Sequence, residues 1–244
     1  MRKISAILKE NAYSKHIKFF ETDIPHLDNF ILTEEAYRIR LRGEERKMAN
    51  IIYETVRGIE RVSIEDEMLR NRKIFFVEEV NEKSTNELIR QLMYLEQAGR
   101  GEEITLYINS PGGEVTSGLA VYDVIRLMES PVNTVCIGTA ASMGAILFLS
   151  GKRRGMLPHT RLMIHDPSYG SGNFGGKKSH EIQHELDKLN ETRETLAEII
   201  AEKTGKSLDE IYRVTAEDTY YSAKEALEFG LATGIITDAE GLRT

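Results

Sequence analysis

Short apolar runs alternate with amphipathic segments along the chain from residue 74 onward. Apolar runs bounded by glycine, proline or charged residues are typical of buried strands, whereas apolar positions three or four residues apart indicate a helix with one buried face. The pattern predicts strands at 74–77, 104–108, 132–137 and 161–164. It predicts helices at 84–98, 116–128, 143–149, 176–203, 208–212 and 223–229. This alternation predicts an α/β fold with repeated crossover connections.

The first 48 residues do not follow this pattern. They are rich in charged residues and contain neither a continuous apolar core nor a small-residue cleavage site, so they do not resemble a secretory signal. The acidic residues Glu10, Glu21 and Asp23 argue against a transit peptide. We therefore expect an N-terminal extension at 1–48 and a cytoplasmic location.

Composition restricts the classes of function. The 244 residues are 41% hydrophobic and 29% charged, which is typical of a soluble globular protein. A formal net charge of −7 argues against a nucleic-acid-binding surface. The most apolar stretch, 132–149, is interrupted by polar residues and glycines, so it predicts a buried strand and helix and not a membrane span. The single cysteine, Cys136, cannot form an intramolecular disulfide and fits a reducing compartment.

Ser142 lies in the sequence GTAASMGA, where the predicted strand at 132–137 leads into the predicted helix at 143–149. A serine at this point presents its hydroxyl from the first turn of a helix, whose unpaired N–H groups can bind an oxyanion. Serine is also a favoured helix N-cap, and a structural cap is the commoner reason for a serine at such a position. Ser142 is therefore a candidate nucleophile only in combination with other residues.

Three further segments supply such residues. LMIHDP places His165 at the end of a predicted strand that Pro167 terminates, and AEDTYYSAKEALEFG places Asp218 shortly before a predicted helix. Acyl transfer needs a nucleophile, a base that takes its proton and a carboxylate that orients the base. INSPGGEV at 108–115 follows another predicted strand, and its glycines allow a close approach of backbone N–H donors to a substrate.

The stretches INSPGGEVTSGLAVYD, GTAASMGA, LPHTRLMIHDP and EDTYYSAKEALEFGL resemble, in this order, the signature stretches of the Clp protease proteolytic subunit, a self-compartmentalising serine peptidase. The resemblance covers the chain from about Asn50 to Ile236. Several motifs in the same order are a much more specific signal than any one of them.

The resemblance also assigns roles to single residues. It implies that Ser142 is the nucleophile, His165 the general base and Asp218 the residue that orients the base. It implies that the backbone N–H groups of Gly113 and Met143 form the oxyanion hole. The cleavage reaction then needs neither a metal nor an organic cofactor in this subunit.

The same resemblance implies an architecture and an assembly. The expected fold is the crotonase-like stack of repeated ββα units, with an axial N-terminal region and first helix at 49–73, a peptidase domain at 74–244 and a protruding handle helix at about 168–204; residues 1–48 are then an extension or a removable propeptide. Subunits of this family form heptameric rings that stack in pairs around a chamber. An AAA+ Clp ATPase unfoldase consumes the ATP and feeds unfolded polypeptides into that chamber, with no nucleic-acid or membrane partner.

Several positions depart from the family pattern. Glu217 stands directly before the candidate acid, where relatives usually have an arginine that pairs between rings. Asp166 stands directly after the candidate base, where relatives usually have a glutamine, and the glycine-rich stretch 170–176 lengthens the segment that joins rings. On the unfoldase-docking surface Tyr107 is retained, but Thr105 replaces a common tyrosine. We therefore expect these positions to affect three properties: ring stacking, substrate handling and ATPase docking.

Three alternative functions fit parts of the sequence. HEIQH matches a zinc-peptidase motif, with His180 and His184 one helical turn apart and Glu181 as base, but the surrounding helix is polar on nearly all sides and a catalytic zinc needs a dry cavity and a third ligand. A catalytically quiet ring subunit is expected to lose triad residues, and this chain keeps all three. A crotonase-like acyl-CoA enzyme would not need a serine beside His165 and Asp218. We take the serine endopeptidase as the leading interpretation.

Overall fold

The computed structural model describes residues 50–55, 58–169, 176–239 and 241. The chain divides into two compact units, residues 1–64 and residues 65–244. The expected N-terminal extension at 1–48 and the glycine-rich stretch from 170 to 175 lie outside the described residues.

The described part of the first unit is an antiparallel hairpin. Its strands are β1 (Asn50–Thr55) and β2 (Gly58–Ser63), paired from Asn50 opposite Ser63 to Thr55 opposite Gly58. Gly58, at the turn end of β2, has a φ of 120°, a conformation that favours glycine.

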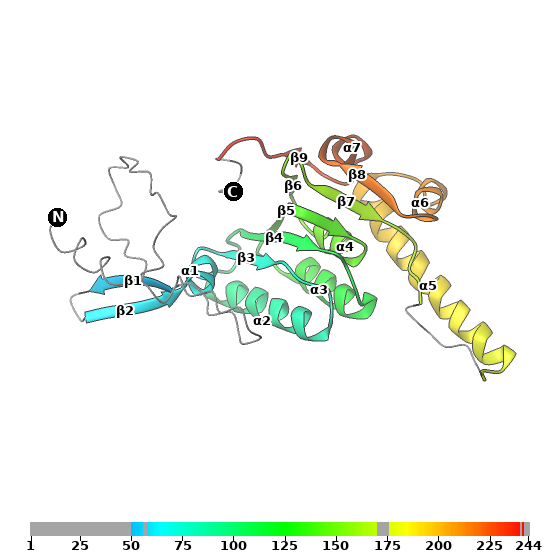
Figure 1. The fold of residues 1–244 in the computed structure, drawn as a ribbon, viewed down its shortest axis with the longest axis horizontal. Helices are drawn as coiled ribbons and strands as arrows, with labels where there is room; N and C mark the ends of the chain where they lie inside the picture. Colours follow the sequence, from blue (N-terminus) through cyan, green and yellow to red (C-terminus); the bar gives the residue numbers. More distant parts are fainter. Residues whose placement is uncertain (1–49, 56–57, 170–175, 240, 242–244) are drawn as a thin grey trace, which may run out of the picture. The chain divides into compact units, whose positions relative to one another are not determined.

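A mostly parallel sheet forms the centre of the second unit (Figure 1). Each neighbouring pair of its main strands is parallel, in the order β3 (Lys73–Phe76), β4 (Ile104–Ser110), β5 (Val132–Ala141), β6 (Arg154–Met156) and β9 (Gly234–Ile235). The end of β5 also pairs in parallel with β7 (Arg161–Ile164), which pairs antiparallel with β8 (Thr219–Ser222). Parallel strands joined through helices confirm the predicted α/β fold.

Helices follow most of these strands in turn. α1 (Ile64–Arg70) precedes β3, while α2 (Glu82–Ala98), α3 (Val115–Leu127) and α4 (Met143–Leu149) follow β3, β4 and β5 and lie on one side of the sheet (Figure 1). The long α5 (Ser179–Thr204) extends beyond the sheet and is followed by α6 (Leu208–Thr215) and α7 (Ala223–Phe229). This arrangement is consistent with the crotonase-like fold that the sequence implies.

The core of the second unit fixes the segment that follows Ser142. α2 buries Leu88, Leu92 and Leu95, the apolar face that the sequence pattern predicts. All seven residues of α4, Met143–Leu149, are buried. Because α4 lies in the interior on every side, a residue attached to its first turn has little freedom to move.

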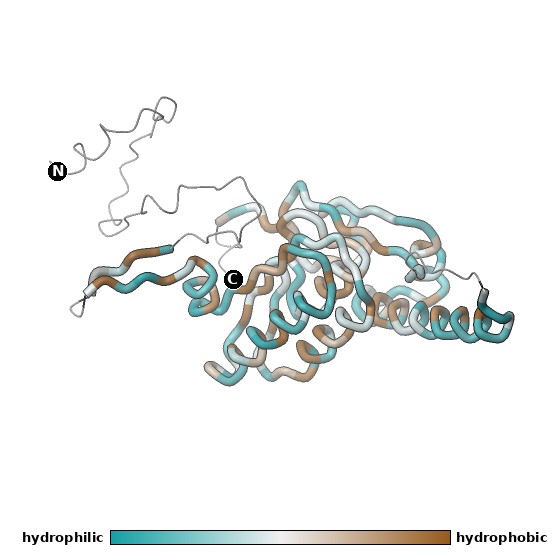
Figure 2. The backbone as a smooth tube through the Cα atoms, turned by 60° about the horizontal axis from the view of Figure 1, so that its bottom comes forward, coloured by the Kyte–Doolittle hydropathy of each residue, from teal (hydrophilic) through white to brown (hydrophobic). Residues whose placement is uncertain are grey.

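The two halves of α5 differ in character. Hydrophilic residues predominate in its outer turns (Figure 2), whereas its buried residues lie near its C-terminal end and are Leu196, Ala197, Ile199 and Ile200. No helix in the described part of the chain is long and apolar enough to cross a membrane.

The observed start of α2 and end of β5 differ from the predicted limits. β5 continues to Ala141 and does not stop at residue 137, because Thr139, Ala140 and Ala141 pair with β7. α2 begins at Glu82 and not at residue 84, because the side chain of Asn81 caps it by accepting the N–H of Ser84 at 3.1 Å. The first difference matters for the site, since it carries β5 directly to Ser142.

Candidate active site

The register of β5 and β7 places Ser142 beside the end of β7. The two strands pair in parallel with Ala141 opposite Met163, and the N–H of Ser142 donates to the carbonyl of Met163 at 2.9 Å. His165 is the first residue after β7. Ser142 and His165 are therefore brought together by strand pairing and not by proximity in sequence.

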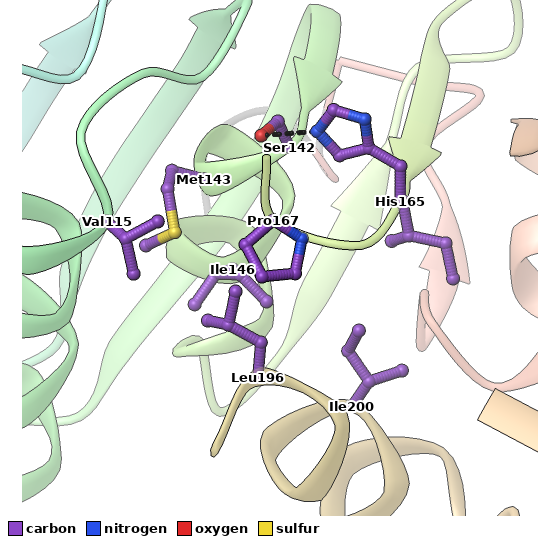
Figure 3. A pocket seen from close by; sticks show the side chains of 9 residues that line it. Val115, Ser142, Met143, Ile146, His165, Pro167, Leu196 and Ile200 are labelled. Atoms are coloured by element: carbon purple, nitrogen blue, oxygen red, sulfur yellow. Dashed lines mark hydrogen bonds between the residues drawn. The ribbon is translucent and has the colours of Figure 1, made fainter. Parts of the chain in front are cut away.

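The register of β7 and β8 brings Asp218 to the same point. The antiparallel pairing places Ile164 opposite Thr219, so the next position along the ladder has His165 opposite Asp218. His165 Nδ1 lies 2.8 Å from Asp218 Oδ1, and His165 Nε2 lies 2.9 Å from Ser142 Oγ. Figure 3 shows the contact between Ser142 and His165. The three predicted side chains thus form one hydrogen-bonded chain.

This chain of hydrogen bonds assigns the tautomer of His165. A carboxylate only accepts hydrogen bonds, so the short contact with Asp218 places a proton on Nδ1. Nε2 then has a free lone pair, which accepts the hydroxyl proton of Ser142. The side chain of His165 is 27% exposed, so a substrate can reach it. The arrangement is suited to moving a proton from Ser142 to His165.

The backbone of Ser142 is strained. Its φ of 53° and ψ of −123° are unusual for a residue with a side chain, and such conformations cost about 1–3 kcal/mol. The surrounding structure holds it there, since the carbonyl of Ser142 accepts the N–H of Ala145 at 2.9 Å and that of Ile146 at 3.3 Å. Ser142 is the N-cap of α4, but its side chain makes no capping hydrogen bond. The sharp turn presents the hydroxyl to His165 instead.

The glycine-rich loop after β4 lies against the turn at Ser142. A Cβ on Gly112 would stand 2.6 Å from the Cβ of Ser142, and a Cβ on Gly113 would stand 2.1 Å from the carbonyl oxygen of Val80. Gly113 has a φ of 145° and forms a parallel bridge with Val80. Within the described residues the N–H groups of Gly113 and Met143 donate to no acceptor. Both donors thus remain available to a ligand.

An apolar cavity adjoins the hydroxyl of Ser142 (Figure 3). It is a small recess that opens to solvent. The end of β7 and the segment after it, the first turns of α3 and α4, and the C-terminal part of α5 contribute to its lining, which is Val115, Ser142, Met143, Ile146, Ile164, His165, Pro167, Leu196 and Ile200. An apolar group of a ligand that enters this recess lies next to the hydroxyl of Ser142.

The comparison with protein families agrees with this geometry. The family model that describes Clp protease matches residues 57–239, which is well over half of the chain. The chain belongs to the Clp protease family. Members of this family are serine peptidases and use no cofactor, so the family and the geometry agree on the class of chemistry.

The zinc motif on α5 lies within the residues that the Clp protease model matches. His180 and His184 are exposed. Among the described residues no group of three histidine, cysteine, aspartate or glutamate side chains is placed to hold a metal ion. Within the part of the chain that the structure describes, the pair has neither the third ligand nor the enclosed cavity that a catalytic zinc requires.

Two acidic residues that depart from the Clp protease pattern have distinct environments. Asp166 does not contact the imidazole of His165; its Oδ1 accepts the hydroxyl of Thr215 at 2.6 Å, and its Oδ2 lies 2.7 Å from Nε of Arg193. Glu217 is exposed, and its carboxylate has no cationic partner in the part of the chain that the structure describes. Asp218 is accordingly the carboxylate that partners His165.

The apolar lining of the cavity was not predicted from the sequence. Leu196 and Ile200 lie on a helix whose first half is polar, and Ile146 lies in a uniformly apolar stretch. The one available signal was the change of α5 from polar to apolar residues after Thr195.

Proposed function

We propose that this chain is the proteolytic subunit of an ATP-dependent Clp protease, a serine endopeptidase that hydrolyses unfolded polypeptides to short peptides. The observation that carries the proposal is the hydrogen-bonded chain from Ser142 through His165 to Asp218, with contacts of 2.9 Å and 2.8 Å. Its position beside free N–H donors and an apolar cavity supports acyl transfer over a structural role.

The proposed reaction follows from these contacts. Ser142 Oγ attacks the carbonyl carbon of the scissile peptide bond while His165 Nε2 takes its proton. Asp218 holds the Nδ1–H of the resulting imidazolium. His165 then gives the proton to the leaving amine, and a water molecule that His165 deprotonates hydrolyses the ester on Ser142.

The oxyanion is the second element of the proposed mechanism. As the carbonyl carbon becomes tetrahedral, its oxygen gains negative charge, which the N–H groups of Gly113 and Met143 stabilise. Loss of one such donor raises the barrier by about 3–4 kcal/mol. The close packing of the glycine loop against Ser142 keeps these donors in place before substrate binds.

The proposed assembly is a heptameric ring, stacked in pairs, to which an AAA+ Clp ATPase delivers unfolded polypeptides in the cytoplasm. Family membership and the projecting α5 support this proposal. On the proposed docking surface Tyr107 is buried and stacks on Phe75, with ring centroids 4.6 Å apart, whereas Phe75 is about half exposed. Phe75 is thus the aromatic side chain that a docking ATPase would contact there.

Hydrolysis of an unstructured fluorogenic peptide by the purified full-length chain tests the proposed function. Wild type should cleave the peptide without another subunit, and Ser142→Ala should not. Ser117→Ala, which removes a hydroxyl that donates to Glu114, serves as the matched control and should retain activity. Inactive wild-type rings would favour the catalytically quiet subunit, and chelator-sensitive cleavage by Ser142→Ala would favour a metallopeptidase.

A further inference from the structure

Asp166 is the residue after the candidate base, His165, and three contacts hold it in place. Its N–H donates to the carbonyl of Thr215 at 2.6 Å, and its Oδ1 accepts the hydroxyl of Thr215 at 2.6 Å. Its Oδ2 lies 2.7 Å from Nε of Arg193, on α5. The main chain that carries His165 is thereby connected to both α5 and α6.

The surroundings of Asp166 favour a neighbouring cation. Thr215 is the last residue of α6, and the carbonyl end of a helix disfavours a neighbouring carboxylate. Asp166 is only 28% exposed, so water compensates its charge incompletely. Arg193 supplies the opposite charge, and within the described chain it is the cation that pairs with Asp166.

The guanidinium of Arg193 is itself held in place. Its carbon lies 4.4 Å from the ring centroid of Tyr212, a cation–π contact. The Nε of Arg193 is buried and donates no hydrogen bond of good geometry to any described residue. The 2.7 Å contact between Nε and Oδ2 of Asp166 is therefore an ion pair and not a hydrogen bond. Tyr212 and Thr215 are three residues apart on α6 and so lie on the same face of that helix.

The same face of α5 reaches the apolar cavity. Arg193, Leu196 and Ile200 are spaced by three and four residues, which places them on one side of the helix. Leu196 and Ile200 line the cavity next to Ser142 (Figure 3). The ion pair therefore fixes α5 at the place where this helix forms the cavity wall.

We propose that Arg193 is a positioning residue for His165. By pairing with Asp166, Arg193 holds the main chain of the base where Nε2 lies 2.9 Å from Ser142 Oγ. It also couples this position to the helix that lines the cavity. The inference rests on the proposed function, since it assigns to Arg193 an effect on the reactivity of Ser142.

The rate at which a fluorophosphonate probe labels Ser142 tests this inference, together with kcat and KM for a peptide. Arg193→Ala should label about tenfold more slowly per folded molecule, because small displacements of a catalytic group cost this much or more. The loss should appear in kcat more than in KM. Asp166→Asn should lose a similar factor, and the double variant should be no slower than the slower single variant, because both remove one interaction.

Two further variants separate positioning from general stabilisation. Arg193→Lys keeps the charge and should recover most of the labelling rate. Arg126→Ala removes a different ion pair of α5, the 3.0 Å contact with Glu202, and should label within twofold of wild type. Thermal unfolding of each variant gives the folded fraction by which the rates are divided.

The outcomes distinguish the inference from the proposed function. If wild type itself is not labelled at Ser142, the proposed function fails. If wild type is labelled and Arg193→Ala or Asp166→Asn reacts within twofold of it per folded molecule, Arg193 does not position His165. Fully additive losses in the double variant would also overturn the inference. Should Arg193→Ala fail to fold, Asp166→Asn, which preserves the side-chain shape, provides the same comparison.

Discussion

His165 and Asp218 occupy opposing positions one residue beyond the paired part of β7 and β8, and their side chains approach to 2.8 Å. Antiparallel neighbours at such a position lie close enough for their side chains to interact. The geometry of the base therefore depends on the register of two short strands. A shift by one residue would turn Asp218 to the other face of the ladder.

Removing the charge of Asp218 should abolish most of the activity. Asp218→Asn can donate to Nδ1 and so favours the wrong imidazole tautomer, which lowers kcat by about 10⁴-fold in a triad of this kind. Peptide hydrolysis measures the change, with thermal unfolding as a check on the fold. Glu217→Gln, at the exposed neighbouring residue, is the matched control and should keep wild-type kcat. Comparable losses in both variants would contradict the role of Asp218.

Gly113 should tolerate no side chain. Gly113→Ala places a Cβ 2.1 Å from the carbonyl oxygen of Val80, so the loop must move and the N–H donor moves with it. Gly101 also has a positive φ, 83°, but a Cβ there meets nothing within 4 Å. We expect Gly101→Ala to cost about 1 kcal/mol of stability and to keep activity, whereas Gly113→Ala loses at least about 10²-fold in kcat. Urea unfolding and peptide hydrolysis measure both effects, and an active Gly113→Ala would exclude this oxyanion donor.

The apolar cavity should select the residue before the scissile bond. A peptide library should be cleaved preferentially after apolar residues, because the lining is apolar apart from Ser142 and His165. Leu196→Phe reduces the cavity and should raise KM for peptides with a large apolar residue more than for peptides with alanine. Leu186→Phe, at an exposed site on the same helix, should change neither value. Preferential cleavage after charged residues would show that another surface determines specificity.

Cys136 should be unreactive in the folded protein. The side chain is fully buried in β5, and burial raises the pKa of its thiol, so the reactive thiolate is scarce at neutral pH. Iodoacetamide should modify Cys136 at least about a hundredfold more slowly in buffer than in urea, since modification requires opening of the sheet. Peptidase activity should survive exposure of native protein to the reagent. Rapid inactivation would instead indicate a cysteine nucleophile.

Local sequence patterns predicted the long elements better than the short ones. The apolar spacing of Leu88, Leu92 and Leu95 was sufficient for α2. The predicted helix at 223–229 is α7, and a capping box of Ser222 and Glu225 stands at its start. β6 and β9 were missed because strands of three and two residues are too short to show a pattern, and β8 was missed because its sequence TYYS contains no aliphatic run. β6 also contains Arg154, which is buried because it donates to the carbonyls of Leu231 and Gly230.

The candidate site was also predicted only in part from the sequence. Motifs supplied Ser142, His165 and Asp218, because each stands next to turn or capping signals that local sequence reveals. The strained backbone of Ser142, the cavity lining from α5 and the pairing of Asp166 with Arg193 depend on contacts between distant segments. Such contacts follow from strand register and helix packing, which no local pattern encodes.

The central claim is that the hydroxyl of Ser142 is made nucleophilic by His165. Mass spectrometry of peptides from the fluorophosphonate-treated full-length protein tests it most directly. We predict a single stoichiometric adduct on Ser142 in wild type, a labelling rate lower by several orders of magnitude in His165→Ala and no adduct in Ser142→Ala. An adduct on another residue, or equal labelling of Ser142 with and without His165, would contradict the account.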